Sequence, residues 1–99
     1  MREFFIYILT NKHNNVFYIG VTNNLERRTL EHKQGLIEGF SKKYNLKKLI
    51  YHETYPNAET AIQREKQLKN WHRDWKINLI KLANPEFKDL SGDPETSSG

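Results

Sequence analysis

The sequence of 99 residues contains no cysteine, which excludes disulfide bonds and metal sites built from thiolates. A composition of this kind suits a reducing compartment. Long apolar runs are missing as well, because the longest, residues 4–9, is far shorter than the roughly 20 residues that span a bilayer. That run is also too short for a secretory signal, and no small-residue cleavage pattern follows it. We therefore expect a cytoplasmic protein without a membrane partner.

Acidic residues are outnumbered, since 16 Lys and Arg against 12 Asp and Glu give a formal net charge of +4. A basic balance favours a polyanionic partner, nucleic acid before a membrane, although many basic domains of this size bind nothing in particular. The length is enough for one domain and too short for two. We expect this domain over residues 1–90 and a disordered tail over residues 91–99, which are rich in Ser, Gly, Pro and acidic side chains.

Three segments rich in β-branched and aromatic residues predict strands, and they cover residues 4–9, 16–21 and 49–55. The first two are joined by a short polar loop, residues 11–15. Strands joined by a loop of this length ordinarily pair as an antiparallel hairpin, so the sequence predicts a hairpin at its start.

Helix signals follow the hairpin at once. Asn23 is the expected N-cap of a helix over residues 24–34, with Glu26 completing a capping box and Gly35 ending the helix. Residues 35–48 form a basic connection dotted with aromatic side chains, and no regular structure is assigned to them.

Two further helices are expected after the third strand. The first covers residues 58–71 and is capped by Asn57. The second covers residues 74–82 and is stopped by the Asn84-Pro85 step, because the residue before a proline avoids helical backbone angles.

The first helix places two polar residues on its apolar face. Leu25, Arg28 and His32 fall on nearly one line, because helix positions advance by about 100° per residue. A guanidinium and an imidazole in this position need an anionic partner, and the planar fork of arginine suits a phosphate or a carboxylate. The alternative is a structural salt bridge beside a packed histidine.

The helix over residues 58–71 repeats this pattern with the opposite charge, because Glu65 projects from its apolar stripe. A carboxylate directed toward the core is costly unless it is paired or holds a metal. One interpretation is a direct salt bridge between Glu65 and Arg28. The other is a hard cation such as Mg²⁺, which one or two carboxylates hold together with water and phosphate oxygens.

The expected hairpin brings two hydroxyl groups together. Tyr7 and Tyr18 flank the short loop and should lie near each other across the strand pair, to within a residue of register. Each alone is ordinarily a packing residue, but a pair near a cation could bind water, or one could act as a base with a lowered pKa. Gly20 would let a ligand or another backbone approach closely.

Five blocks stand in order along the chain: Ile6-Tyr7-Ile8-Leu9-Thr10, Tyr18-Ile19-Gly20, residues 25–33, residues 61–66 and Asn84-Pro85. Together they resemble the GIY-YIG nuclease superfamily over residues 3–90, and its small stand-alone bacterial branch in particular. The resemblance implies an α+β fold with a small three-stranded antiparallel sheet flanked by helices. It also implies hydrolysis of DNA phosphodiester bonds that depends on Mg²⁺ or Mn²⁺.

Carried over position by position, the resemblance gives each candidate residue a role. Tyr18 would activate the attacking water with assistance from Tyr7, although the sequence does not decide which tyrosine is the base. Arg28 and His32 would bind the scissile phosphate. Glu65 would be the protein carboxylate on the metal.

The end of the match is less well defined. Asn84 is the first choice for the family's late asparagine, which supports the phosphate site, and Asn78 is the second. Two positions depart from the family pattern: the glycine of the first motif is Phe5 here, and Val21 stands where the excision-repair branch has lysine.

Basic residues interleaved with aromatic ones suggest how nucleic acid is held, as in proteins that bind single strands. The first such group lies in the connection and comprises Lys42, Lys43, Lys47 and Lys48 beside Phe40 and Tyr44. The second comprises Trp71, His72, Arg73, Trp75 and Lys76. The alternatives are a solvated loop for the lysines and, as the favoured interpretation of the tryptophans, core packing between the last two helices.

The leading hypothesis is therefore a metal-dependent endonuclease or exonuclease acting on single-stranded, branched or damaged DNA. RNA remains open as a substrate. The alternative is a nucleic-acid-binding module that keeps the nuclease fold without catalysis. We expect a monomer and leave a protein partner open.

Overall fold

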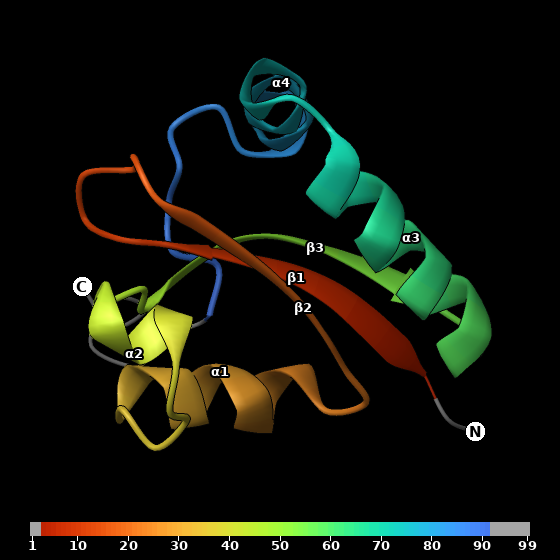
Figure 1. Ribbon diagram of the computed structural model, residues 1–99, viewed down its shortest axis with the longest axis horizontal. Coiled ribbons are helices and arrows are strands. Elements are labelled where there is room, and N and C mark those ends of the chain that lie inside the picture. The colour runs from red at the N-terminus through yellow and green to blue at the C-terminus, as the bar shows by residue number, and fades with distance from the viewer. Residues whose placement is uncertain (1–2, 92–99) are drawn as a thin grey trace.

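A computed structural model of the chain describes residues 3–91 (Figure 1). Three strands, β1 (Phe4–Thr10), β2 (Phe17–Thr22) and β3 (Lys48–Tyr55), form one antiparallel sheet in the order β2-β1-β3. The expected hairpin and the expected three-stranded sheet are thus confirmed. The expected tail lies outside the described residues from residue 92 onward.

Helices cover both faces of the sheet, which confirms the α+β fold class. The helices α1 (Leu25–Lys33) and α2 (Phe40–Lys43) lie on one side of it, and α3 (Ala58–Asn70) and α4 (Arg73–Ala83) lie on the other (Figure 1). Among residues 3–91, no helix is long and apolar enough to cross a bilayer.

The start of α1 differs from the expectation by one residue. Asn24, not Asn23, is the N-cap, and its side-chain oxygen accepts a hydrogen bond from the Arg27 backbone N–H at 3.0 Å. The expected capping box with Glu26 is therefore wrong. The physical reason is the Thr22 hydroxyl at the end of β2, which accepts from the Asn24 N–H at 3.1 Å and extends the turn by one residue.

The other end of α1 is closed as expected. Gly35 has a φ of +69°, and its N–H donates to the His32 carbonyl at 3.1 Å while the Leu36 N–H donates to the Glu31 carbonyl at 2.9 Å. This pair of bonds is the Schellman arrangement that glycine favours. The following helix, α2, was not expected, because four residues without a side-chain cap carry no periodic pattern.

Strand β1 is buried on both of its faces. One face joins α3 and α4 in an apolar core that includes Ile6, Ile8, Ile19, Leu68 and Ile80. The opposite face joins α1 and the connection after it in a smaller core of Tyr7, Leu9, Leu46 and Leu49. The candidate tyrosine Tyr7 therefore belongs to the α1 face of the sheet.

A charged clamp fixes α3 against β3. The Arg64 guanidinium donates to both carboxylate oxygens of Glu53, from Nε at 2.9 Å and from Nη2 at 3.0 Å. The hydroxyls of Tyr51 and Tyr55 donate to the same carboxylate at 2.5 and 2.6 Å. Burial alone would raise the pKa of Glu53, but the bonds from Arg64 and the two tyrosines outweigh it and lower the pKa.

Removing one partner of this clamp should destabilise the fold. Arg64→Met leaves the partly buried Glu53 carboxylate uncompensated, so we expect the free energy of unfolding at pH 7 to fall by about 3 kcal/mol. Because the folded pKa of Glu53 is lowered, the stabilisation is present above the unfolded pKa and is lost as the pH falls through the folded pKa. The difference between wild type and variant should therefore shrink in acid, as measured by urea unfolding.

The matched control is Arg27→Met, since Arg27 is exposed and reaches Glu31 only at 4.0 Å. Its cost should stay below about 1 kcal/mol. Equal costs for the two arginine variants would show that the clamp does not hold α3.

Candidate active site

The two hairpin tyrosines lie on the α1 face of the sheet. Tyr18 pairs with Leu9 and Tyr7 pairs with Gly20, so the tyrosines are diagonal neighbours whose ring centres are 6.2 Å apart. The expected register was therefore wrong by more than one residue. The shift is an even number of residues, so both side chains still point to the same face.

Gly20 provides the room for the Tyr7 ring. A Cβ atom at this position would lie 2.5 Å from Cζ of Tyr7, closer than real contacts allow. The sequence had suggested that a ligand or a backbone approaches Gly20, and the structure places a side chain of the site itself there. Because Gly20 has no side chain, the Tyr7 ring can lie directly against the backbone of β2.

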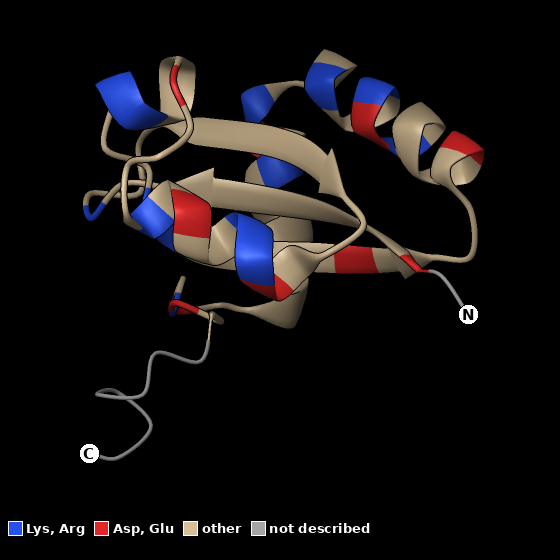
Figure 2. Cartoon of the chain, turned by 90° about the horizontal axis from the view of Figure 1, so that it is seen from below, with Lys and Arg blue, Asp and Glu red and all other residues tan. Residues whose placement is uncertain are grey.

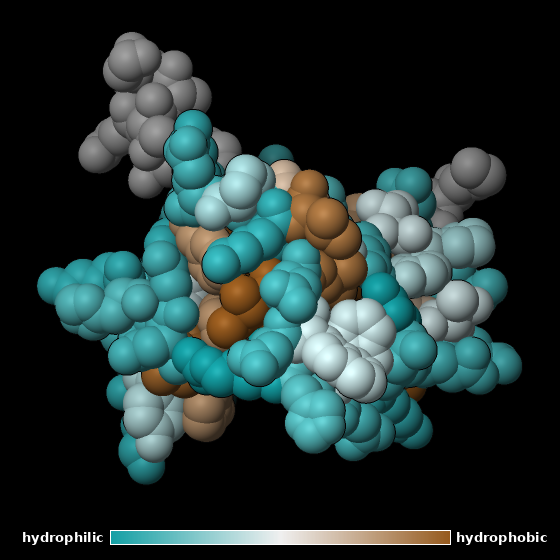
Figure 3. Space-filling model, turned by 90° about the horizontal axis from the view of Figure 1, so that it is seen from above, coloured by the Kyte–Doolittle hydropathy of each residue, from teal (hydrophilic) through white to brown (hydrophobic). Residues whose placement is uncertain are grey.

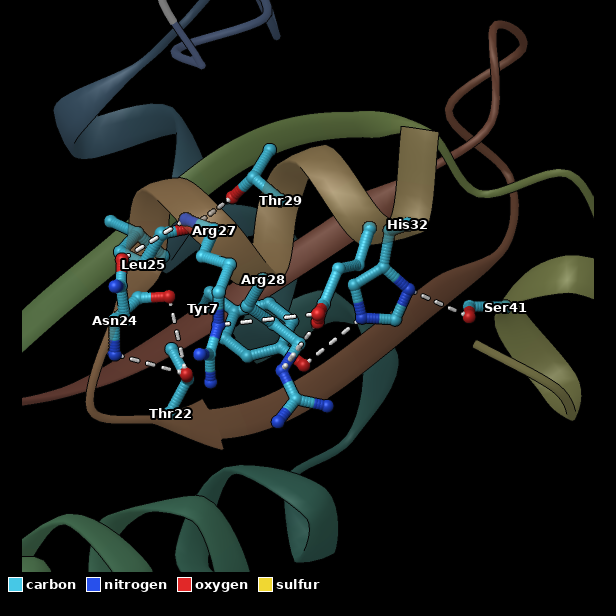
Figure 4. A network of polar contacts seen from close by, with 10 residues as sticks. Tyr7, Thr22, Asn24, Leu25, Arg27, Arg28, Thr29, His32 and Ser41 are labelled. Carbon is cyan, nitrogen blue, oxygen red and sulfur yellow. Dashed lines mark hydrogen bonds and ion pairs between the residues drawn. The ribbon is translucent and has the colours of Figure 1, made fainter. Parts of the chain in front are cut away.

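His32 connects Tyr7 on β1 to Ser41 on α2 (Figure 4). Its Nε2 lies 3.1 Å from the Tyr7 hydroxyl and its Nδ1 lies 2.9 Å from the Ser41 hydroxyl. The ring centre is 5.7 Å from those of both Tyr7 and Tyr18, and the residue is only 4% exposed. Ser41, on α2, was missed because a serine within a basic connection gives no signal of its own.

The Tyr7 hydroxyl determines the tautomer of His32. Burial raises the pKa of Tyr7, nearby Tyr18 raises it further, and Arg28 only partly opposes them, so the phenol keeps its proton at neutral pH. Nε2 of His32 lies within hydrogen-bond distance of this phenol, and a hydrogen bond with Tyr18 also raises its pKa. We assign the phenol as the donor to Nε2, and Nδ1 then carries the ring proton and donates it to Ser41.

Arg28 and Glu65 do not pair with each other, which removes the direct salt bridge that the sequence had left open. Arg28 Nε lies 3.8 Å from Glu31 on its own helix, and Glu65 lies 3.2 Å from Lys69 on its own helix. Both charges nevertheless act on Tyr7, where that of Arg28 lowers the pKa of the hydroxyl and that of Glu65 raises it. The two candidate residues therefore share the neighbourhood of one phenol.

The Arg28 guanidinium has donors to spare. In Figure 4 its side chain extends from α1 across the Tyr7 ring. The Nε atom is buried without a hydrogen-bond partner among the described residues. A guanidinium offers five N–H donors in a planar fork, so this side chain is suited to an anionic ligand.

Asn84 does not join this cluster through any hydrogen bond in the described part of the chain. Its amide donates to the Ile50 carbonyl at 3.0 Å and to the Lys88 carbonyl at 2.8 Å, and its oxygen accepts from the Lys88 N–H at 3.1 Å. The residue is 5% exposed and ties the chain after α4 to β3. The rival, Asn78, is an exposed residue of α4.

Metal ligands are sparse in the described chain. Residues 3–91 contain no group of three or more His, Asp or Glu side chains arranged to hold an ion. Glu65 supplies one hard oxygen donor, and its side chain is 20% exposed. A donor set of one carboxylate fits Mg²⁺ or Mn²⁺ better than zinc, because Mg²⁺ sites rely on water and phosphate oxygens for the remaining ligands.

Two of the lysines expected to bind nucleic acid have partners at the surface. Lys42 pairs with Glu38 at 2.8 Å, and Lys43 Nζ lies 5.4 Å from the centre of the Tyr44 ring. Exposed pairs of this kind contribute little to stability, so both lysines remain available to a phosphate.

The other two lysines line an open hollow of about 460 Å³ beside the end of β1. Lys12 and His13, from the β1–β2 connection, lie in the same hollow as Lys47 and Lys48. Lys12 was not among the expected residues, because only the sheet brings the two connections together. Seen from the α1 side, charges lie on helices and connections, whereas β1 and β2 carry none (Figure 2).

Known proteins share this fold and this sequence pattern. Residues 3–78 match the profile of the GIY-YIG catalytic domain. The UPF0213 protein CPE1444 of Clostridium perfringens is 36% identical over 76 residues, which cover 77% of this chain and 81% of that one. A UPF0213 protein of Syntrophus aciditrophicus is 33% identical over 87 residues, or 87% and 98% of the two chains.

The solution NMR structure of the UPF0213 protein BH0048 from Bacillus halodurans shows the same fold. Its TM-score is 0.56 at 24% identity, and the match covers 88% of this chain and 92% of that one. The chain therefore belongs to the GIY-YIG family of nuclease domains. Within that family its relatives include proteins of the UPF0213 group, whose names state no activity.

The contact between Gly20 and Tyr7 can be tested by a double-mutant cycle. Gly20→Ala should lower the free energy of unfolding by about 1–3 kcal/mol, because the added methyl group overlaps the Tyr7 ring. In a Tyr7→Ala background the same change should cost much less. Urea unfolding of the four proteins measures the coupling, and an unchanged cost would mean that the ring does not occupy this space.

His32 should titrate below its ordinary range. Burial and the nearby Arg28 charge lower the pKa of His32, and Glu31 only partly opposes them. An NMR titration should therefore give a midpoint below about 6.5, and Arg28→Met should raise it. The control Arg27→Met, on an exposed neighbour, should leave the midpoint in place. Ring ¹⁵N shifts should also show the proton on Nδ1, and a proton on Nε2 would contradict the assigned tautomer.

Proposed function

We propose that this protein is a metal-dependent nuclease that hydrolyses DNA phosphodiester bonds. The observation that carries the proposal is the arrangement around Tyr7. A second tyrosine and a buried histidine pack around one hydroxyl, and the charges of Arg28, whose Nε has no partner, and of Glu65 act on its pKa. Membership in the GIY-YIG family supports nucleic acid as the substrate class.

Tyr18 is the proposed base that activates the attacking water. Tyr7 is 2% exposed and the pKa of its hydroxyl is raised, so it is poorly suited to accept a proton. Tyr18 is only partly buried and is therefore the hydroxyl that a solvent molecule can reach. Tyr7 would orient this water and the Tyr18 ring. Its own hydroxyl would keep its proton and donate a hydrogen bond to His32.

Arg28 and His32 would act on the phosphate. The spare donors of Arg28 can bind two phosphate oxygens at once and balance the charge that develops during attack. A neutral His32 can accept a hydrogen bond from Tyr7 without repelling Arg28, and Ser41 holds its ring in that orientation. Ser41 is thus a positioning residue of the site.

Glu65 would hold the Mg²⁺ or Mn²⁺ ion. When bound, such an ion withdraws charge from the phosphate and from the leaving oxygen. Lys69, at 3.2 Å, balances the Glu65 charge in the absence of other cations. A carboxylate in this position would repel a phosphate unless a cation accompanied it, which favours catalysis over simple binding.

The flanking DNA would follow the basic surface beside the site. Lys47, Lys48 and Lys12 line one hollow, and Lys42 and Lys43 lie on the exposed side of α2. Contacts of this type bind phosphates without reading bases, so they confer affinity that falls with salt and little sequence preference.

Cleavage and binding should respond differently to Glu65→Gln. Labelled single-stranded, duplex and branched DNA would be incubated with the protein in Mg²⁺, Mn²⁺ or a chelator. We expect the variant to cut at least about 100-fold more slowly, and to bind DNA in the chelator as tightly as wild type or more tightly. Glu59→Gln, an exposed residue of the same helix, should change neither property.

Two results would contradict the proposed nuclease activity. If the wild-type protein binds these DNAs and cuts none of them under any metal condition, the alternative, a non-catalytic binding module, is established. Cleavage by Glu65→Gln at the wild-type rate would instead show that the carboxylate has no part in the chemistry. RNA versions of the same substrates would decide the sugar preference.

A further inference from the structure

The two tryptophans of the chain have different environments. Trp71 is partly buried and packs against the core between the sheet and the last two helices, as the favoured interpretation of the sequence had it. Trp75, in the first turn of α4, is 55% exposed, so core packing does not account for it. A large aromatic side chain left in solvent is free to contact a ligand.

Neighbouring rings hold the Trp75 indole in place. The Trp71 ring meets it nearly perpendicularly at 5.9 Å between centres, and the His72 ring does so at 5.4 Å. These edge contacts favour one orientation of the indole while over half of the residue stays exposed. A fixed aromatic surface loses little entropy when a flat ligand stacks on it.

The segment that carries this indole is basic. Residues 64–76, the end of α3 and the start of α4, contain five Lys and Arg against two acidic residues. The Arg64 guanidinium lies 5.2 Å from the centre of the Trp71 ring. On the face that carries α3 and α4, apolar surface lies exposed in the middle and hydrophilic side chains surround it (Figure 3). A flat apolar ligand that carries negative charge fits this combination.

This surface reaches the candidate site along α3. Arg73 donates to the Asn15 carbonyl at 2.7 Å and lies 5.0 Å from the centre of the Phe17 ring, on the face of β2 opposite to Tyr18. On α3, Lys69 contacts Glu65. A strand bound in the site could therefore continue along this face.

We propose that Trp75 is a stacking platform for an unpaired base, with the cations of the α3–α4 junction holding the adjoining phosphates. The platform deepens the proposed function, on which it rests for its nucleic-acid ligand, because it selects single-stranded segments over duplex. Stacking requires an accessible base face, and a continuous duplex does not offer one. The base identity is not read, since every base has such a face.

Intrinsic fluorescence tests the platform directly, because the chain has only two tryptophans. A single-stranded oligothymidylate of about ten nucleotides would be titrated in chelator, so that nothing is cut. We expect it to quench the wild-type signal. Trp75→Ala should weaken binding about tenfold, and Trp75→Phe, which keeps a stacking ring, should recover most of the loss. Trp75→Ala should not weaken the binding of a hairpin duplex of equal charge.

Leu82→Ala is the matched control, since Leu82 lies on the same helix and is 87% exposed. It should bind the single strand as wild type does. The platform is overturned if Trp75→Ala binds single strands like wild type, or if it loses duplex and single-strand binding equally. It is also overturned if sedimentation shows the wild-type protein to associate through this face and Trp75→Ala to be monomeric, because a second copy would then be the occupant.

The proposed nuclease activity and the proposed stacking platform can be disproved independently. Binding is measured without metal, so a protein that cuts nothing but loses single-strand affinity with Trp75→Ala retains the platform. A protein that cuts DNA but binds single strands independently of Trp75 retains the nuclease alone.

Discussion

The burial of the Tyr7 hydroxyl is the constraint on which the candidate site depends. The ring lies over Gly20, where any side chain would displace it, and the hydroxyl then requires an acceptor away from solvent. His32 is that acceptor, and its other nitrogen requires Ser41 in turn. The position of Tyr7 on β1, His32 on α1 and Ser41 on α2 therefore depends on a glycine at position 20 of β2.

The sequence predicted those features of the site that follow from local periodicity. The i, i+4 spacing of Arg28 and His32 placed both on the inward face of one helix, and the apolar stripe around Glu65 did the same for another. The hairpin was predictable from its two strands and short loop. Its register was not, because the loop backbone, with Asn14 at a φ of +58°, sets the offset of the strands.

Features that depend on tertiary contacts were beyond the sequence. Nothing near Ser41 marks it as a partner of a histidine nine residues earlier. The choice of partners for Arg28 and Glu65 was open, since each could pair across the site or along its own helix. The exposure of Trp75 depends on the residue at which α4 begins after the break that follows α3. A shift of the helix start by one residue would turn Trp75 to another face.

The clamp on α3 has a consequence for the chemistry. Arg64 and Glu65 are consecutive, so they point about 100° apart around the helix axis. With Arg64 fastened to Glu53 on β3, α3 cannot roll, and the direction of the Glu65 carboxylate is decided before any ligand arrives. The packing that stabilises the fold thus also orients this candidate metal ligand, and a sequence that relaxed the helix would keep every candidate residue and lose their alignment.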